Sequence, residues 1–446
     1  MELKKPKNEN YSATVIQIKT LVPISNCDNV VHAIIMGNQV VVGKDVKVGD
    51  IGLYFPLETQ LSEIYLKNNN LYRKAELNTD PTQKGYFEEN GRIRCVKFRG
   101  NKSEGLFMPR SSIIFTESNP LSVGDCFDEL NGIEICRKYV VKKHNTPGLP
   151  GSKKNRIKKE HESKLIDNQF RFHCDTSMMY KNLHRINPDD IISITYKLHG
   201  TSGISSKILC KKKLKWYERI LKFLRINIVD TQYDYLYSSR KVIKNEELNP
   251  SAQHFYNVDI WKLADDILRE HLQAGMTFYY EIVGYLPTGG LIQKDYDYGY
   301  EEGKFGVYIY RMTYTNIFGK VFEFSAKQVQ DFCKQNGLNA VPQLYYGYAK
   351  DFIDHFILLF EDKFYGGNEL TCKVKEEFNS DKFLERIKLL YNEKDCYMSK
   401  NKVPEEGCVI RIEKNEFEAF KQKSNAFYER ETKLLDKGES NIEDEN

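Results

Sequence analysis

The sequence predicts an α+β protein in which an all-β N-terminal region is followed by a larger region of mixed strands and helices. Three observations support this fold class. Short β-branched and aromatic runs fill the first part of the chain, and apolar residues at helical spacing alternate with strand-like runs later. A stretch rich in Pro, Gly and Lys separates the two regions. With 446 residues, 41% of them hydrophobic, the chain is long enough for two or three domains with their own cores.

The N-terminal region contains strand-like runs separated by Asn, Gly, Asp and Pro. Between residues 11 and 135 these runs are ATVIQIK, VVHAIIM, QVVVG, DIGLYF, RIRCVKF and GLFMP. About five strands in such a span predict a small barrel of the OB-fold type, which we place at residues 1–136. Some OB-folds bind nucleic acid, whereas others support a neighbouring domain, and the sequence leaves both roles open.

We interpret residues 137–169 as a linker, because Pro147, Gly148, Pro150 and Gly151 interrupt regular structure there. The linker also carries a dense group of cations: Lys153, Lys154, Arg156, Lys158 and Lys159. Such a run is either a solvated connection or a contact for a nucleic-acid backbone.

Residues 170–433 mix strands with helices, and residues 434–446 form an acidic tail. One helix is predicted in KKKLKWYERILKFLRINI and another in NSDKFLERIKLLYNEKD. In the first helix the apolar residues recur at helical spacing: Leu214, Tyr217, Ile220, Leu221 and Leu224. We favour a helix packed on the core, with contact to RNA as the alternative.

Composition indicates the redox compartment of the protein and the kinds of partner that we expect it to have. Ten cysteines occur without a CxxC pair, which favours reduced thiols in the cytoplasm over disulfides or zinc clips. No run approaches 18 apolar residues, so we expect no membrane partner. No obligate protein partner is evident. The net charge of +4 does not by itself indicate a polyanionic partner.

The run YKLHGTS places Lys197 after the strand-like run IISIT. A lone lysine at a strand end is ordinarily a surface residue. Further along the chain, however, charged or aromatic residues lie on or beside five other strand-like runs: SSRK, FYYEIVG, KFGVYIYR, EEGCVIRI and FKQKS. Together they supply a nucleophile, an arginine, two carboxylates, aromatic rings and a lysine pair. This set suits attack on a nucleotide phosphate.

In this order the runs resemble motifs I, III, IIIa, IV and V of the covalent nucleotidyltransferases, the superfamily of ATP-dependent DNA and RNA ligases and mRNA capping enzymes. The likeness extends from Lys197 to Lys423. It is greatest to phage double-strand RNA ligases and to RNA ligases with an N-terminal OB domain. The resemblance implies a nucleotidyltransferase domain of ATP-grasp-like antiparallel sheets with helices.

The resemblance also implies a role for each matching residue. Lys197 is the implied nucleophile, which attacks the α-phosphate of ATP to form a lysyl-AMP. Its amine, with a reference pKa of about 10.4, must lose a proton first. Gly200 lets the backbone approach the nucleotide. Arg240 contacts ribose or phosphate, or is simply a surface arginine in a turn. Tyr310 stacks on adenine, or belongs to the core.

The remaining matches are charged side chains. The resemblance implies that Glu281 and Glu406 hold ribose or a Mg²⁺ or Mn²⁺ ion, with Glu405 as an adjacent alternative to Glu406. Lys421 and Lys423 lie two residues apart and meet the α-phosphate.

Further candidates for the nucleotide site lie at His199 and upstream of Lys197. His199 departs from the aspartate that most of the superfamily carries, although phage double-strand RNA ligases also have histidine there, and we include it in the nucleotide site. Upstream, Arg171 or His173 is a further candidate for binding ATP phosphates.

The sequence therefore predicts an ATP-dependent RNA ligase that joins 3′-OH and 5′-phosphate ends of nicked or broken RNA during repair. The module order, with the OB-like region before the ligase motifs, favours this branch. Two alternatives remain. One is a DNA ligase or another nucleotidyltransferase, and the other is a non-catalytic RNA-binding protein, for which His199 is the hint.

Overall fold

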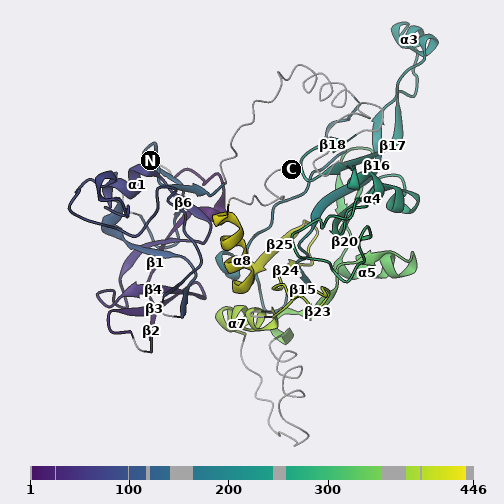
Figure 1. Ribbon diagram of the computed structural model, residues 1–446. Coiled ribbons are helices and arrows are strands. Elements are labelled where there is room, and N and C mark those ends of the chain that lie inside the picture. Colours follow the sequence, from purple (N-terminus) through teal and green to yellow (C-terminus); the bar gives the residue numbers. More distant parts are fainter. Residues whose placement is uncertain are drawn as a thin grey trace, which may run out of the picture.

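The computed structural model describes residues 3–25, 27–98, 100–116, 121–140, 164–244, 258–352, 378–391 and 394–437. Within these ranges a β-rich N-terminal domain lies beside a larger α+β domain, and a narrow arm projects from the latter (Figure 1). The cation group of the predicted linker, residues 153–159, lies outside the described residues, as do residues 438–446 of the acidic tail. The α+β prediction is confirmed.

The N-terminal domain contains every strand-like run named from the sequence. Its main sheet has the order β10-β1-β5-β9, and a meander β2-β3-β4 lies next to it. The strands are β1 (Ala13–Gln17), β2 (Thr20–Pro23), β3 (Val30–Ile35), β4 (Asn38–Gly43), β5 (Ile51–Phe55), β6 (Thr59–Leu61), β7 (Val96–Phe98), β8 (Asn101–Ser103), β9 (Leu106–Pro109), β10 (Cys126–Phe127), β11 (Glu129–Leu130), β12 (Ile133–Glu134) and β13 (Cys136–Lys138). The helices are η1 (Glu9–Tyr11), α1 (Glu63–Asn68), η2 (Ala75–Leu77) and η3 (Arg110–Ile113).

The larger domain has two antiparallel sheets. One has the order β18-β17-β16-β19-β20-β21, with β22 beside β20, and the other β14-β25-β24-β15-β23. The strands are β14 (Ser177–Met178), β15 (Ile191–Tyr196), β16 (Thr201–Lys211), β17 (Thr231–Ser239), β18 (Ile243–Lys244), β19 (Met276–Gly284), β20 (Phe305–Thr315), β21 (Val321–Glu323), β22 (Asn339–Ala340), β23 (Gln343–Tyr348), β24 (Gly407–Ile412) and β25 (Glu418–Lys423). The helices are η4 (Met179–Lys181), η5 (Leu183–Arg185), α3 (Trp216–Phe223), α4 (Ile260–Leu268), η6 (Arg269–His271), α5 (Ala326–Gln335), α7 (Ser380–Tyr391) and α8 (Asn425–Asp436).

The two domains share one hydrophobic core. Ile16 and Val40 of the N-terminal domain belong to the same buried cluster as Ile194 and Phe420 of the larger domain. Burial of a side chain of this size stabilises by about 1.5–3 kcal/mol, so a continuous cluster opposes separation of the domains. The OB-like domain therefore supports its neighbour, which was one of the two roles left open by the sequence.

Buried polar contacts join the same two domains. The Arg92 guanidinium has no solvent exposure and donates to both oxygens of Glu58, at 2.7 and 2.8 Å. Both groups then meet α8: Arg92 contacts Asp436 at 3.1 Å, and Glu58 accepts from the Thr432 hydroxyl at 3.2 Å. Burial raises the pKa of Glu58, and Arg92 opposes that rise. This group therefore anchors the last described helix to the N-terminal domain.

The expectation that residues 214–224 pack on the core is wrong. The helix forms as α3, but it lies at the tip of the β16–β17 arm and contains no buried residue (Figure 1). Helical spacing of apolar residues specifies an amphipathic helix but not what covers its apolar side. The second predicted helix, α7, contributes Phe383 and Ile387 to the shared core.

The sequence also led us to expect reduced cysteines and no membrane-spanning helix. Cysteines in the described ranges are free thiols, nine in all. Among the same residues, no helix has the length and apolar character needed to cross a bilayer.

We predict that Arg92→Ala lowers the free energy of unfolding by about 3–5 kcal/mol, because it leaves the Glu58 carboxylate buried without its cation. Urea unfolding of the full chain measures the loss. Arg73→Ala is the matched control, since the Arg73–Glu88 ion pair is exposed and should contribute less than about 1 kcal/mol. Equal losses in the two variants would show that the Arg92 contact does not anchor the domains.

Candidate active site

Strand pairing brings Lys197 to Glu406, although 208 residues separate them in the chain. Lys197 directly follows β15, and its backbone N–H donates to the Gly407 carbonyl at 2.9 Å, which extends the β15–β24 ladder. The Lys197 Nζ then lies 2.6 Å from Glu406 Oε1. Gly407 has φ +140°, and a Cβ there would lie 2.1 Å from the Gln422 carbonyl oxygen. The glycine after Glu406 is therefore required by backbone packing.

The Glu406 carboxylate is the centre of a buried polar group. It is 2% exposed, and three side chains approach it. Besides Lys197, the Lys423 Nζ lies 3.7 Å from Oε1 and the His199 Nδ1 lies 3.7 Å from Oε2. Lys423 also faces Glu431 at 3.5 Å. A buried carboxylate is costly unless cations and donors compensate it, and these neighbours do so.

His199 is held by aromatic rings as well as by charge. Its ring meets the edges of Tyr296 and Phe427, with centroids 4.9 Å apart in both pairs. Its backbone N–H donates to the Tyr298 hydroxyl at 2.6 Å. Where the related motif has an aspartate, this chain therefore has an imidazole enclosed between rings and directed at a carboxylate.

Gly200 and Glu281 are brought together by the β16–β19 pairing. Glu281 Oε1 accepts from the Gly200 N–H at 3.1 Å, and Oε2 accepts from the Ser202 hydroxyl at 2.9 Å. A Cβ on Gly200 would lie 2.2 Å from the Ile282 carbonyl oxygen. The close approach that requires glycine is thus to β19. The approach to a nucleotide stays a prediction.

A cavity of about 120 Å³ opens beside these residues. Five of the residues named from the sequence line it together: Lys197, Arg240, Glu281, Tyr310 and Lys421. The other predicted residues, His199, Gly200, Glu406 and Lys423, do not line it, and two of them contact Lys197 or Glu281 directly. The structure therefore brings the nine predicted residues together: five line the cavity, and the other four lie beside them.

The segment 171–176 also reaches the cavity. His173 and Thr176 line it, and the His173 Nδ1 lies 2.8 Å from the Tyr310 hydroxyl. Arg240 pairs with Asp175. Arg171 instead donates to Asn168 at 3.1 Å and does not line the cavity. Of the two upstream candidates, His173 is the one at the site.

Sequence reasoning missed several residues at this cavity, among them Asp175, Arg411 and Phe417. Asp175 partners Arg240, and Arg411 and Phe417 belong to the lining. The Arg311 and Arg411 guanidinium carbons lie 4.1 and 5.4 Å from the centre of the Phe417 ring. Arg411 stands in the EEGCVIRI run, four residues after Gly407, so period-2 alternation along that strand was the available signal.

Glu405 and Glu406 have different environments. Burial, together with the neighbouring Glu406 charge, raises the pKa of Glu405 to about 7, whereas Glu406 has Lys197 and Lys423 beside it. At neutral pH a large share of Glu405 is therefore uncharged. The charge complementarity at Lys197 comes from Glu406.

We predict that Glu405→Gln stabilises the protein at pH 8 by at most about 3 kcal/mol, because burial raises the pKa of the Glu405 carboxyl to about 7 in the folded protein. A raised folded-state pKa gives stability that is present below about pH 4.5 and is lost as the pH rises through 7. The gain should therefore shrink toward zero as the pH falls to about 4.5. Urea unfolding at both pH values tests this, and an equal gain at both would contradict the shift.

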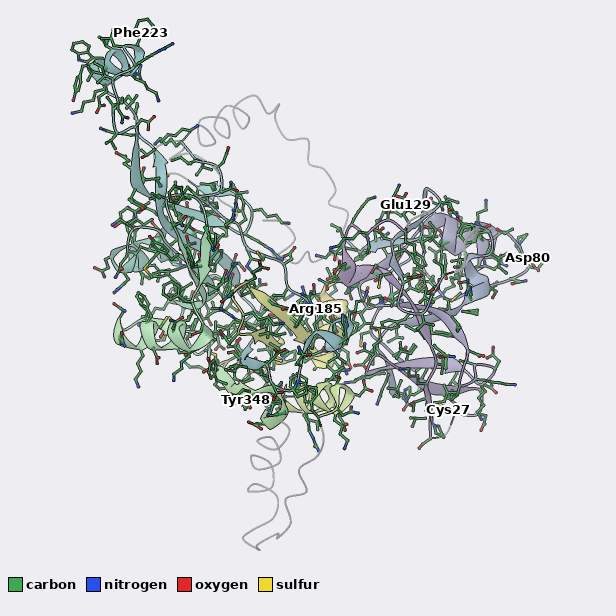
Figure 2. The ribbon with its side chains drawn as sticks, turned by 180° about the vertical axis from the view of Figure 1, so that it is seen from behind. Cys27, Asp80, Glu129, Arg185, Phe223 and Tyr348 are labelled. Carbon is green, nitrogen blue, oxygen red and sulfur yellow. The ribbon has the colours of Figure 1, made fainter. Side chains whose placement is uncertain are left out.

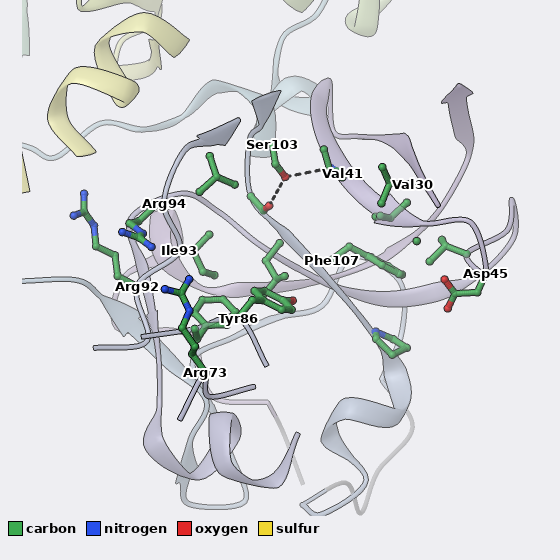
Figure 3. A pocket seen from close by; sticks show the side chains of 18 of the residues that line it. Val30, Val41, Asp45, Arg73, Tyr86, Arg92, Ile93, Arg94, Ser103 and Phe107 are labelled. Carbon is green, nitrogen blue, oxygen red and sulfur yellow. Dashed lines mark hydrogen bonds between the residues drawn. The ribbon is translucent and has the colours of Figure 1, made fainter. Parts of the chain in front are cut away.

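A second, larger cavity of about 910 Å³ lies in the N-terminal domain (Figure 3). Arg73, Tyr86 and Arg94 line it, and Ile93 and Phe107 form an apolar wall (Figure 3). The Arg94 guanidinium also pairs with Asp436 of α8 at 3.3 Å. Tyr86 is 56% exposed, and its ring lies 5.0 Å from that of Phe87. Exposed aromatic rings beside guanidinium groups form a surface on which flat, anionic ligands can bind.

Comparisons with known proteins agree with this architecture. A family model for an OB-fold domain matches residues 12–110. No curated protein matches the chain by sequence. Solved structures of Naegleria gruberi RNA ligase are similar over nearly the whole chain. A mutant with AMP and Mn has a TM-score of 0.55 at 17% identity, covering 94% of this chain and 98% of its own.

Two further structures of that ligase give the same result. A mutant with ATP and Mn has a TM-score of 0.55 at 17% identity, covering 95% of this chain and 99% of its own. The ligase with PPi has a TM-score of 0.53 at 17% identity, with coverages of 94% and 98%. At this identity the likeness establishes the fold: an N-terminal OB domain joined to an antiparallel domain of the ligase type. The predicted fold is confirmed.

Proposed function

We propose that this protein is an ATP-dependent RNA ligase that works through a covalent lysyl-AMP. The observation that carries the proposal is the position of the Lys197 amine. It lies 2.6 Å from the buried Glu406 carboxylate on the wall of a cavity that Arg240, Tyr310 and Lys421 also line. A lysine beside a carboxylate, facing a cationic and aromatic cavity, suits nucleophilic attack on a nucleotide.

The first step is adenylylation of Lys197. Its Nζ attacks the α-phosphorus of ATP, a nitrogen–phosphorus bond forms, and the bond to the pyrophosphate oxygen breaks. The ammonium group must lose a proton before the attack, and Glu406 Oε1 is the acceptor in contact with it at 2.6 Å. Lys421, on the cavity wall, balances charge on the α-phosphate, while Lys423 balances the Glu406 carboxylate behind it.

The other lining residues position the nucleotide. Tyr310 offers a ring to adenine, and its hydroxyl is fixed by His173 at 2.8 Å. Arg240 faces the sugar or a phosphate once ATP competes with Asp175. Glu281 fixes the turn after Lys197 through its bonds to Gly200 and Ser202, and remains the candidate for the ribose hydroxyls.

A divalent cation fits this site through few protein ligands. Among the described residues, no three His, Cys, Asp or Glu side chains gather as a metal cage. Mg²⁺ and Mn²⁺ commonly bind one or two carboxylates together with water and substrate phosphates, and Glu281 and Glu406 are the candidates here. Such an ion would neutralise the triphosphate and favour the neutral form of the amine.

The later steps act on RNA. AMP moves from Lys197 to the 5′-phosphate of one end, and the 3′-OH of the other end then displaces AMP to form the phosphodiester bond. We propose nicked or broken RNA as the substrate, repair as the role and the cytoplasm as the place. The N-terminal cavity with Tyr86, Arg73 and Arg94 contributes an RNA-binding surface.

We predict that the wild-type protein retains ³²P after incubation with α-labelled ATP and Mg²⁺ or Mn²⁺, and that Lys197→Ala does not. Denaturing electrophoresis measures the covalent label. Prior incubation with pyrophosphate, which is then removed, returns any AMP already on the protein to ATP and frees the lysine for labelling. Lys350→Ala, at an exposed lysine paired with Asp189, is the control and should label normally. An unlabelled wild type, with GTP also tried, would favour the alternative of a non-catalytic RNA-binding protein.

A nicked duplex with RNA or DNA on either side of the nick distinguishes the alternatives within the enzymes. Sealing that requires RNA at the 3′-OH side supports an RNA ligase. Equal sealing of all-DNA nicks would assign the protein to the DNA ligases.

We predict that Tyr86→Ala weakens binding of single-stranded RNA by about 1–3 kcal/mol, the contribution of one stacked base, without altering adenylylation. Fluorescence anisotropy with a labelled oligonucleotide measures the change. Tyr348→Ala removes a ring of similar exposure, 46%, from the larger domain and should leave RNA affinity unchanged. Unchanged affinity in Tyr86→Ala would exclude this cavity as an RNA site.

A further inference from the structure

Helix α3 leaves its apolar side open to solvent. The helix stands at the far end of the β16–β17 arm, and Phe223 marks the extreme tip of the molecule in the rear view (Figure 2). Trp216 is 75% exposed and Phe223 is 86% exposed. Contiguous apolar surfaces of this kind mark sites of interaction.

The exposed apolar residues form a single face. With about 100° of rotation per residue, five of them gather on one side of the helix and its last turn, together with the half-buried Leu221. The five are Trp216, Tyr217, Ile220, Phe223 and Leu224. Glu218, Arg219 and Lys222 occupy the opposite side. Two residues of the segment between α3 and β17, Ile226 and Val229, extend the apolar surface, being 51% and 75% exposed.

The tip is a defined structure. The Glu218 carboxylate accepts from the Lys215 backbone N–H at 2.7 Å and from the Lys212 amine at 2.6 Å. Lys222 pairs with Asp230 at 2.7 Å, and the Lys212 N–H donates to the Asp230 carbonyl at 2.8 Å. These contacts fix α3 to the end of the arm, so its apolar face is held outward.

The charge of the tip limits what can cover it. Residues 211–230 contain seven Lys and Arg against two carboxylates, a net charge of +5. Both carboxylates, Glu218 and Asp230, are paired with lysines of the tip. A partner must therefore be anionic and also offer an apolar layer. An anionic phospholipid bilayer offers both at its interface. RNA offers phosphates but no apolar layer for Ile220 or Leu224.

We propose that the α3 tip binds the surface of anionic phospholipid bilayers, with its apolar face in the headgroup boundary and its cations at the lipid phosphates. The contact is peripheral, and it revises the sequence-based expectation of no membrane partner. It does not depend on the ligase reaction. Since β16 begins at Thr201, next to Gly200, and runs for 11 residues toward the tip, the arm would hold the candidate active site roughly 35 Å from the membrane surface.

The test uses the full-length protein and vesicles of phosphatidylcholine, with and without phosphatidylglycerol. We expect co-flotation only with the anionic vesicles, decreasing at high salt. Tryptophan fluorescence gives a second measurement. The chain has two tryptophans, and Trp261 is fully buried, so a blue shift on anionic vesicles reports Trp216. Trp216→Phe should abolish the blue shift while retaining co-flotation.

The double variant Trp216→Ser/Phe223→Ser removes the two most exposed rings of the tip, and we expect vesicle binding to fall at least about tenfold. Phe318→Ser is the matched control, because Phe318 is 85% exposed in the turn between β20 and β21. Urea unfolding confirms that both variants fold, independently of any ligase activity.

Absence of binding by the wild type, or equal binding by the double variant, would overturn the proposal. Loss of single-stranded RNA affinity in the double variant, without vesicle binding by the wild type, would also overturn it and assign the tip to nucleic acid.

Discussion

The buried Glu406 carboxylate is the constraint on which the site depends. It is 2% exposed and needs compensating groups, and Lys197 and His199 provide them from one part of the chain and Lys423 from another. Each of these parts is fixed by backbone pairing, since β15, β24 and β25 lie side by side in one sheet. The requirement for charge balance and the order of the strands therefore specify the same arrangement.

This arrangement gives the lysine a double role. In the ion pair, Lys197 stabilises a buried carboxylate, and at the cavity wall the same amine faces the space where a nucleotide phosphate would sit. Lys423 lies beside Glu406 and also pairs with Glu431 at 3.5 Å. In the proposed reaction the Lys197 proton passes to Glu406, which neutralises both groups, and Lys423 keeps Glu431 as its counter-charge.

The N-terminal domain supports the larger domain and also has a cavity on its own surface. Its core continues into that of the larger domain, and Arg92 and Glu58 hold α8, whose Phe427 packs against His199. The same domain leaves Tyr86 exposed in a cavity on its own surface. The arm that carries α3 differs from this domain in its packing, because α3 contains no buried residue and exposes its apolar face.

The sequence by itself determined the fold class and the OB-like domain, since strand runs, glycines and turn residues are local signals, and its resemblance to the nucleotidyltransferases supplied most of the candidate site residues. Lys197 beside HG and Glu406 before glycine were readable in this way. Only the tertiary structure decided that the Glu406 carboxylate is buried against the lysine, that Asp175 meets Arg240, and that α3 is exposed. These outcomes depend on strand register and long-range packing, which no local pattern encodes.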